Sequence, residues 1–260
     1  MPRFKLTIEY AGTRYSGWQV QANARTVQGE VARAVEAATG RDRFELYGSG
    51  RTDAGVHALG QVAHLDVATS LPPATLCERM NDSLPADIAV LSAEKVSHRF
   101  HARHDAVARR YVYQIARRRM AFGKPYVWWV REPLELALMR EAAHRLTGMN
   151  DFRAFTDDDP GEKSTKVLVD RLDLVEAGPF VLVVVEGSHF LWKLVRRLVG
   201  VLVAVGRGDV PPGEVDRLLQ DKARGPTPAQ LTAPASGLFL ARVFYEGDDR
   251  GVPVAPLLNV

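Results

Sequence analysis

Apolar and polar residues alternate along several short stretches of the chain, and a period of two is typical of half-buried strands. Residues 4–10 follow this pattern, and it predicts further strands through 61–67, from Tyr111 to Ile115, and at 238–245. Two other stretches, 167–175 and 180–186, are expected to pair. The second of these is apolar throughout, which predicts a central strand covered on both faces.

A repeat near 3.6 residues predicts three helices. The first covers residues 27–39, with Thr26 as its N-cap and Gly40 as its stop. The second begins at Pro133 and ends near Gly148. The third covers 190–205 and is apolar enough to be buried.

These elements alternate irregularly, with hairpins in place of strict strand–helix–strand units, so the predicted fold class is α+β. A length of 260 residues allows one large domain or two of ordinary size. We place a boundary near residue 105, which gives an N-terminal half (1–105) and a C-terminal half (106–260).

Composition excludes several classes of protein. The single cysteine, Cys77, rules out an internal disulfide and a cysteine-built zinc site, and it fits a reducing cytosol. The N-terminus lacks the apolar core of a secretory signal. The apolar stretch 190–205 contains three cations, each costing roughly 2.5–3.5 kcal/mol in a bilayer, so we expect no membrane helix and a cytoplasmic protein. Those cations are Lys193, Arg196 and Arg197.

Positive charge is concentrated in one segment. The net charge is only +3, yet residues 98–119 hold seven arginines against one acid, Asp105, which makes that segment +6. Such clustering indicates a polyanion site, although a solvated basic strand and loop explains it equally well. The rings of Tyr111, Tyr113, His101 and His104 favour RNA, because flat rings stack on unpaired bases.

Residues 47–58 (YGSGRTDAGVHA) form the most informative stretch. Its glycines permit tight turns and close backbone approach, and Arg51 stands two residues before Asp53. The stretch has neither the Walker A pattern nor the dinucleotide fingerprint. From chemistry alone, a turn-forming hydrogen bond is favoured over a catalytic role for Asp53.

Residues 50–58 (GRTDAGVHA) resemble the motif of the tRNA pseudouridine synthase A family. Four other blocks are similar to the family's remaining signatures and follow in the family's order. They are residues 9–19 (EYAGTRYSGWQ), 101–113 (HAR and ARRYVY), 190–200 (FLWKLVRRLVG) and 233–240 (APASGLFL).

The resemblance implies the fold, the partners and the reaction. It implies two α/β halves whose mostly antiparallel sheets join into one central sheet with helices on one side. It further implies a cytoplasmic homodimer without metal or cofactor, which converts uridine to pseudouridine at positions 38, 39 and/or 40 of the tRNA anticodon stem-loop.

The resemblance also implies residue roles. Asp53 is the essential carboxylate, Arg196 its partner, and Tyr111 the ring that stacks on the target base. Arg51 enters the stem as the uridine leaves, and Leu238 forms an apolar wall of the pocket.

The basic segment supplies further expected contacts. Its arginines, Arg103, Arg109 and Arg110 among them, are expected to bind phosphates, which fixes position and not sequence.

Several alternatives remain open at this point. His57 and His64 are expected to be structural or to contact RNA. Tyr113 shares its strand face with Tyr111 and fits a core aromatic. The segment Phe152–Lys166 matches the family poorly, and Arg197 replaces a frequent asparagine. The competing functions are a non-catalytic RNA-binding protein, a related synthase acting elsewhere on RNA, and, more distantly, a hydrolase built on Asp53.

Overall fold

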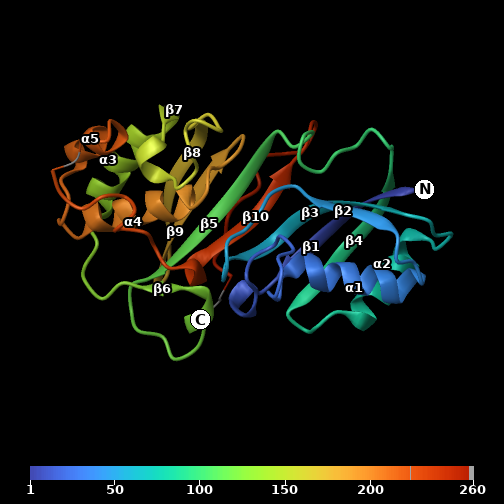
Figure 1. Ribbon diagram of the computed structural model, residues 1–260. Coiled ribbons are helices and arrows are strands. Elements are labelled where there is room, and N and C mark those ends of the chain that lie inside the picture. Colours follow the sequence, from blue (N-terminus) through green and yellow to red (C-terminus); the bar gives the residue numbers. More distant parts are fainter. Residues whose placement is uncertain (223, 258–260) are drawn as a thin grey trace. The chain divides into compact units, whose positions relative to one another are not determined.

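The computed structural model describes residues 1–222 and 224–257 (Figure 1). The chain divides into two compact units, and each holds its own helices and its own set of paired strands, called below the sheet of that unit. The first unit comprises Met1–Val107 and Phe239–Arg250, and the second comprises Ala108–Leu238 and Gly251–Val260. The predicted α+β class is confirmed. The strand predicted at 238–245 belongs mainly to the first unit. The chain first passes from the first unit to the second after Val107, two residues beyond the predicted boundary near residue 105.

The sheet of the first unit has the strand order β4-β1-β3-β10, and β2 also pairs with β3. All of these pairs are antiparallel except β10 with β3, which is parallel. The strands are β1 (Arg3–Tyr10), β2 (Phe44–Gly48), β3 (His57–Val67), β4 (Ile88–Val96) and β10 (Leu238–Phe244). In β1 every second residue is buried, as the alternating pattern predicts.

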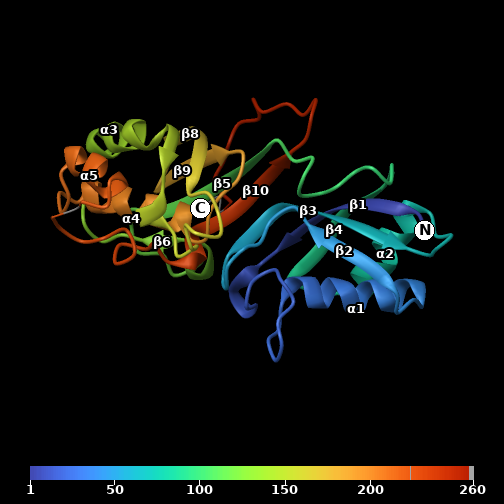
Figure 2. The same ribbon diagram turned by 45° about the horizontal axis from the view of Figure 1, so that its top comes forward.

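Two helices of the first unit, α1 (Val27–Thr39) and α2 (Pro73–Ser83), pack on each other, and Figure 2 shows α1 along one face of the strands. The predicted signals of α1 are confirmed: the Thr26 hydroxyl accepts a hydrogen bond from the Gly29 amide at 3.3 Å, and Gly40 adopts the left-handed conformation. The sequence pattern did not predict α2, because only Leu76 and Met80 are buried along it.

The sheet of the second unit has the order β5-β9-β8-β7, all antiparallel, and β6 pairs with β5 in parallel. Every residue of β9 is buried, which confirms the predicted central strand. The strands are β5 (Ala108–Ala116), β6 (Trp128–Trp129), β7 (Gly148–Asp151), β8 (Lys166–Ala177) and β9 (Phe180–Gly187). The helices are α3 (Leu136–Leu146), α4 (Leu194–Gly206) and α5 (Val215–Leu219).

Helix α4 starts four residues later than the sequence predicts. Lys193, its N-cap, has a φ of +61°, which no helical residue adopts. The preceding residues are drawn instead toward the segment that ends at Lys166, since the Trp192 amide donates to the Asp158 carboxylate at 2.8 Å. The apolar periodicity of the sequence reflects neighbouring residues only, so it does not reveal a hydrogen bond to a residue 34 positions earlier.

Glycines permit a close backbone approach in each unit. In the second unit, a Cβ on Gly200 of α4 would lie 1.7 Å from the Leu231 carbonyl oxygen. In the first, a Cβ on Gly12 would lie 1.9 Å from the Val56 carbonyl oxygen. Both distances are far below van der Waals contact, so the backbones pack together only because these side chains are absent.

We therefore expect Gly200→Ala to lower the free energy of unfolding by at least about 2 kcal/mol, since a rigid carbonyl blocks the added methyl group. Urea unfolding followed by circular dichroism measures the loss. The matched control is Gly213→Ala, whose Cβ would meet nothing within 4 Å. That control should change stability by no more than about 0.5 kcal/mol, and equal losses in both variants would contradict the close-approach argument.

Candidate active site

Asp53 lies in the loop between β2 and β3, residues 49–56, which we call the Asp53 loop. Within it Thr52 is 6% exposed, Asp53 is half-buried and Arg51 is exposed. The backbone turns at this point, because the Val56 amide donates to the Asp53 carbonyl at 3.1 Å. The loop therefore leaves Arg51 exposed and Asp53 half-buried, and the buried Thr52 between them anchors it.

The 11–18 segment holds one side of the Asp53 loop by main-chain hydrogen bonds. The Trp18 amide donates to the Thr52 carbonyl at 3.1 Å, and the Gly55 amide donates to the Tyr15 carbonyl at 3.2 Å. The hydroxyls of Tyr10 and Thr52 also share a buried hydrogen bond of 2.8 Å. These bonds fix the backbone immediately before and after Asp53.

Strand β3 holds the other side of the loop. The Gln61 side chain donates to the Gly50 carbonyl at 3.0 Å and is itself bound by the Ser49 hydroxyl at 2.7 Å. Gln61 is fully buried, so this anchor is shielded from water. A loop fixed on both sides keeps its carboxylate in one place without a substrate, which suits a catalytic group.

His57 has a structural position. It is 1% exposed, its Nδ1 accepts the Gly12 amide at 3.0 Å, and its ring stacks on Phe239 with centroids 4.7 Å apart. An accepting Nδ1 places the proton of the neutral ring on Nε2. His57 thus ties the 11–18 segment to the start of β3.

His64 is also buried, at 2% exposure, and its Nδ1 accepts the Ala102 amide at 3.1 Å. Burial, followed by the charges of Arg3 and His101, lowers the pKa of His64 to about 4, although Asp66 and Asp105 oppose the shift. His64 is therefore a neutral acceptor near pH 7.

In the second unit, Tyr111 and Tyr113 lie on β5 and differ in their surroundings. Tyr113 is fully buried, and its hydroxyl donates to the Pro234 carbonyl at 2.8 Å. Burial raises the pKa of Tyr113, which suits a structural donor. Tyr111 is 9% exposed and meets the Phe190 ring edge-on, with centroids 5.2 Å apart.

Arg196 lies in the first turn of α4 and is bound to the same segment as Tyr113. Its Nε donates to the Ala233 carbonyl at 2.7 Å, and the Ala233 amide donates back to the Arg196 carbonyl at 3.1 Å. Leu238, 4% exposed, ends this segment. Strand β5 and helix α4 thus both hold the stretch that leads to Leu238.

The start of α4 is anchored by a segment without a predicted role, Phe152–Lys166. Asp157 accepts from Lys193 at 2.8 Å and also pairs with Arg197, which is 3% exposed. These bonds from Lys193 and Arg197 lower the pKa of Asp157. The unusual Arg197 and the unusual segment are therefore partners, a relation that a separation of forty positions hides in the sequence.

The basic segment does not form a single patch. Arg109 and Arg110 are buried at 9% and 3% exposure; Arg110 binds Glu186 at 2.7 Å, and Arg109 donates to the Ser188 carbonyl at 2.6 Å. Arg117, by contrast, is exposed and lies just beyond the end of β5, eight residues from Arg109. At about 3.3 Å per residue, the two are roughly 26 Å apart. Of the arginines predicted to bind phosphates, Arg103 is thus exposed, whereas Arg109 and Arg110 are buried and bound within the unit.

Glu186 was missed by sequence reasoning, although a signal for it existed. It is the one acid in the apolar run 180–187, and a buried carboxylate in such a run needs a cation. The register pairs it directly with Arg110.

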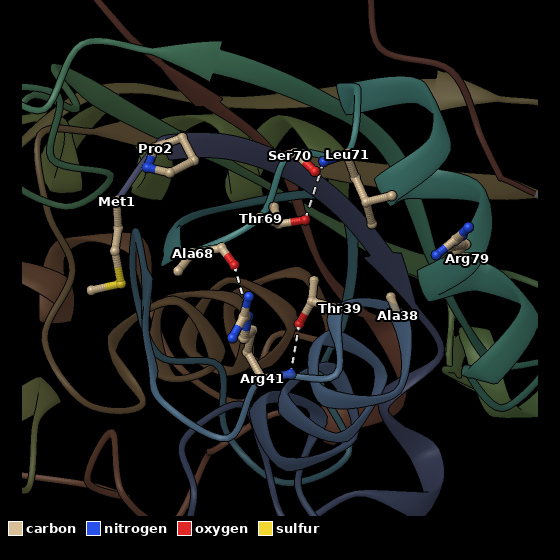
Figure 3. A pocket seen from close by; sticks show the side chains of 10 residues that line it. All are labelled: Met1, Pro2, Ala38, Thr39, Arg41, Ala68, Thr69, Ser70, Leu71 and Arg79. Carbon is tan, nitrogen blue, oxygen red and sulfur yellow. Dashed lines mark hydrogen bonds between the residues drawn. The ribbon is translucent and has the colours of Figure 1, made fainter.

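A hollow of about 610 Å³ opens in the first unit, away from the Asp53 loop (Figure 3). Arg41 crosses it, with its Nε bound to the Ala68 carbonyl at 3.0 Å. The hollow lies beyond the end of β3, whereas the Asp53 loop lies before its start. Ten residue steps at about 3.3 Å place the two roughly 33 Å apart. It contains no predicted site residue.

Among residues 1–222 and 224–257, no three side chains of His, Cys, Asp or Glu gather into a metal-binding group. Within the same described residues, every helix is too short or too polar to cross a membrane.

Comparison with known proteins gives consistent matches. The family model described as tRNA pseudouridine synthase matches residues 6–105 and 142–246. The tRNA pseudouridine synthase A of Nitrobacter hamburgensis is 44% identical over 251 residues, covering 94% of this chain and 100% of that protein. The protein of the same name from Rhodopseudomonas palustris is 42% identical over 252 residues, covering 95% of this chain and 100% of its own.

Among solved structures, the archaeal box H/ACA sRNP Nop10–Cbf5 complex is similar with a TM-score of 0.37 and 13% identity. The match covers 78% of this chain and 44% of that one. A similarity this distant carries no argument about the site.

The lowered pKa of His64 predicts a pH-dependent stability. A histidine in the unfolded chain titrates near pH 6.5. Below that pH, His64 binds a proton in the unfolded state but not in the folded state, where its pKa is about 4. Stability should fall as the pH drops from about 6.5 toward 4, by roughly 2–3 kcal/mol for this group. His64→Asn keeps an acceptor for the Ala102 amide but cannot titrate, so it should lose less stability between pH 7.5 and pH 5.

Urea unfolding at the two pH values measures this difference. The control is His144→Asn, which alters an exposed histidine of α3 and should retain the pH dependence of the unaltered chain. An unchanged pH dependence in His64→Asn would show that other groups cause the loss.

Proposed function

We propose that this chain, which belongs to the tRNA pseudouridine synthase family, modifies uridines 38, 39 and/or 40 of the anticodon stem-loop with Asp53 as its essential carboxylate. Family membership makes it an isomerase that forms pseudouridine in tRNA. The observation that supports Asp53 is its position, since it is half-buried in a loop anchored on both sides.

The reaction requires a group that can react at carbon. The C1′–N1 bond breaks, the uracil turns, C5 bonds to C1′, and the C5 proton is lost while N1 gains one. A carboxylate can attack C1′ or promote a glycal, as glycosidase carboxylates act on oxocarbenium-like charge. Addition of Asp53 to the base is the alternative route, and both need the carboxylate ionised.

We assign Arg196 the role of keeping that carboxylate ionised. Burial alone raises the pKa of a carboxylic acid, and a guanidinium opposes this tendency. The Nε of Arg196 is bound to the Ala233 carbonyl, so its planar group has a fixed orientation. An arginine held in this way is better prepared to bind an anion than a flexible one.

We assign binding of the target uracil to Tyr111 and Leu238. The target uridine must leave its stack, at a cost of a few kcal/mol. The exposed Arg51 fills the vacated position by stacking, Tyr111 stacks on the extruded uracil, and Leu238 supplies an apolar wall. The Tyr111 hydroxyl is the candidate to assist removal of the C5 proton.

We assign phosphate contact to Arg103 and a structural role to Arg109 and Arg110. A buried arginine already paired with Glu186 at 2.7 Å would have to abandon that carboxylate to bind RNA, which leaves a buried charge unpaired. The family resemblance also leads us to propose a cytoplasmic homodimer.

The experiment that tests the function uses unmodified tRNA transcribed with C5-tritiated uridine. The unaltered chain should release tritium to water without added metal. Asp53→Asn should lower the rate at least about a thousandfold, because the amide cannot replace a nucleophilic carboxylate. Its tRNA affinity should stay within a few-fold, since phosphate contacts supply most of the binding.

The possible outcomes separate the candidate functions. Tritium release by the unaltered chain alone supports both the reaction and Asp53. Binding without release by either protein would favour a non-catalytic RNA-binding role or another RNA substrate. Loss of binding together with activity in Asp53→Asn would instead assign Asp53 to folding.

A second prediction concerns phosphate binding. Arg103→Gln should weaken tRNA binding and reduce the slope of log affinity against log salt by about 1, because one phosphate contact is lost. Arg33→Gln is the control, since Arg33 is 66% exposed but pairs with Glu30 on α1. Filter binding at several salt concentrations provides the measurement, and equal slopes in the two variants would remove Arg103 from the interface.

A further inference from the structure

Four aromatic rings form a row in the first unit, outside the Asp53 loop. Tyr47 stacks on His64 with centroids 5.3 Å apart, His64 meets His101 edge-on at 4.6 Å, and His101 lies 4.2 Å from His104. We call Tyr47, His64, His101 and His104 the aromatic row. Tyr47 and His64 are direct partners on β2 and β3, so the sheet itself sets their stacking.

The middle of the row is locked to the backbone. His64 accepts the Ala102 amide at 3.1 Å, and the Tyr245 hydroxyl donates to the Ala102 carbonyl at 2.7 Å. Ala102 is fully buried between these bonds. Both backbone polar groups of Ala102 are therefore satisfied by side chains, one from β3 and one from Tyr245, just after β10.

The outer part of the row is held by a tight turn. His101 Nδ1 accepts the amides of Arg103 and His104 at 3.1 and 3.3 Å, and the His101 amide donates to the Asp105 carboxylate at 2.9 Å. Burial, followed by His104, lowers the pKa of His101. His101 and His64 are thus neutral acceptors near pH 7, and the centre of the row carries no charge.

The ends of the row are open. Tyr47 is 51% exposed, whereas its neighbour His64 is only 2% exposed. His104 and Arg103 are exposed as well. One face of the Tyr47 ring packs on His64, so its exposed area leaves room for a second flat group, while Arg103 adjoins His104 at the other end of the row.

Rigid, uncharged rings beside an arginine match the chemistry of a single-stranded nucleotide. Bases stack on aromatic side chains regardless of sequence, and arginine binds the adjoining phosphate. Because the row is already ordered by backbone bonds, little conformational entropy is lost when a base binds. A scattered exposed aromatic would need no explanation, but this one completes a locked row next to Arg103.

We propose that the aromatic row and Arg103 form a second RNA-contact site that holds one unpaired nucleotide of the substrate, with its base on Tyr47 and its phosphate on Arg103. This inference rests on the proposed action on tRNA. It adds a binding site that is separate from the Asp53 loop.

The test compares four variants at Tyr47 for binding to an unmodified tRNA transcript by filter binding. Tyr47→Ala and Tyr47→Leu should both weaken the Kd about tenfold, the effect of losing one stacked base. Tyr47→Phe and Tyr47→Trp should stay within about twofold, because a ring remains. Leucine keeps apolar volume against His64, so its loss of affinity reports stacking and not packing.

Trp129→Ala is the matched control, since Trp129 is 42% exposed on β6 of the second unit, and its affinity should not change. Leucine and phenylalanine variants that bind equally well would overturn the proposal. The proposed function is tested separately: absence of tritium release by the unaltered chain would contradict it, whatever the Tyr47 variants bind. If Tyr47→Ala fails to fold, as judged by circular dichroism, the leucine, phenylalanine and tryptophan variants decide the question.

Discussion

Contact between two stretches of backbone, the 11–18 segment and the Asp53 loop, is the constraint on which the first unit depends. The Val56 carbonyl occupies the place where any residue other than glycine at position 12 would carry a Cβ. Amide and carbonyl groups then pair across the contact, which satisfies polar groups that would otherwise be buried alone. The helix α1, the short strand β2 and the buried His57 all adjoin this contact, so the position of Asp53 follows from packing and not from the aspartate itself.

In the second unit, charged side chains fix the backbone at the start of α4. Arg197 is buried, and burial of an arginine is tolerated only where a carboxylate accompanies it. Asp157 supplies that carboxylate, and its neighbour Asp158 binds the Trp192 amide and so keeps the residues before α4 out of helical geometry. Arg196, the residue before Arg197, lies in the first turn of α4 with its Nε on the Ala233 carbonyl. The Tyr113 hydroxyl donates a hydrogen bond to the carbonyl of the adjacent Pro234. A core tyrosine and the ion pair of the buried Arg197 with the exposed Asp157 thus flank Arg196, to which we assign a role in the reaction.

Local signals in the sequence predicted much of the fold. Thr26 and Gly40 delimit α1 because caps depend on the nearest few residues, and β9 was recognised because all of its positions are apolar. Position 110 shows where such reasoning stops: an arginine in a basic run resembles a phosphate contact, yet Glu186, 76 residues away, makes it an interior residue. The start of α4 was misplaced for the same reason, since Asp158 acts from 34 residues earlier. For the site, the resemblance supplied Asp53, Tyr111 and Arg196, whereas the anchors Gln61 and Asp157 emerge only from tertiary contacts.

The way the Asp53 loop is anchored affects how its sequence can change over evolutionary time. Its fixings are main-chain groups, the Thr52 hydroxyl and the Gln61 amide, and none of the bonds described here requires the side chains of Ala54 or Arg51. Arg51 is exposed and takes no part in these bonds, so its replacement should disturb the fold less than a replacement of Gly12, whose Cβ would meet the Val56 carbonyl. Under the role proposed for Arg51, natural variation at position 51 reflects selection for activity, whereas variation at position 12 reflects selection for the fold.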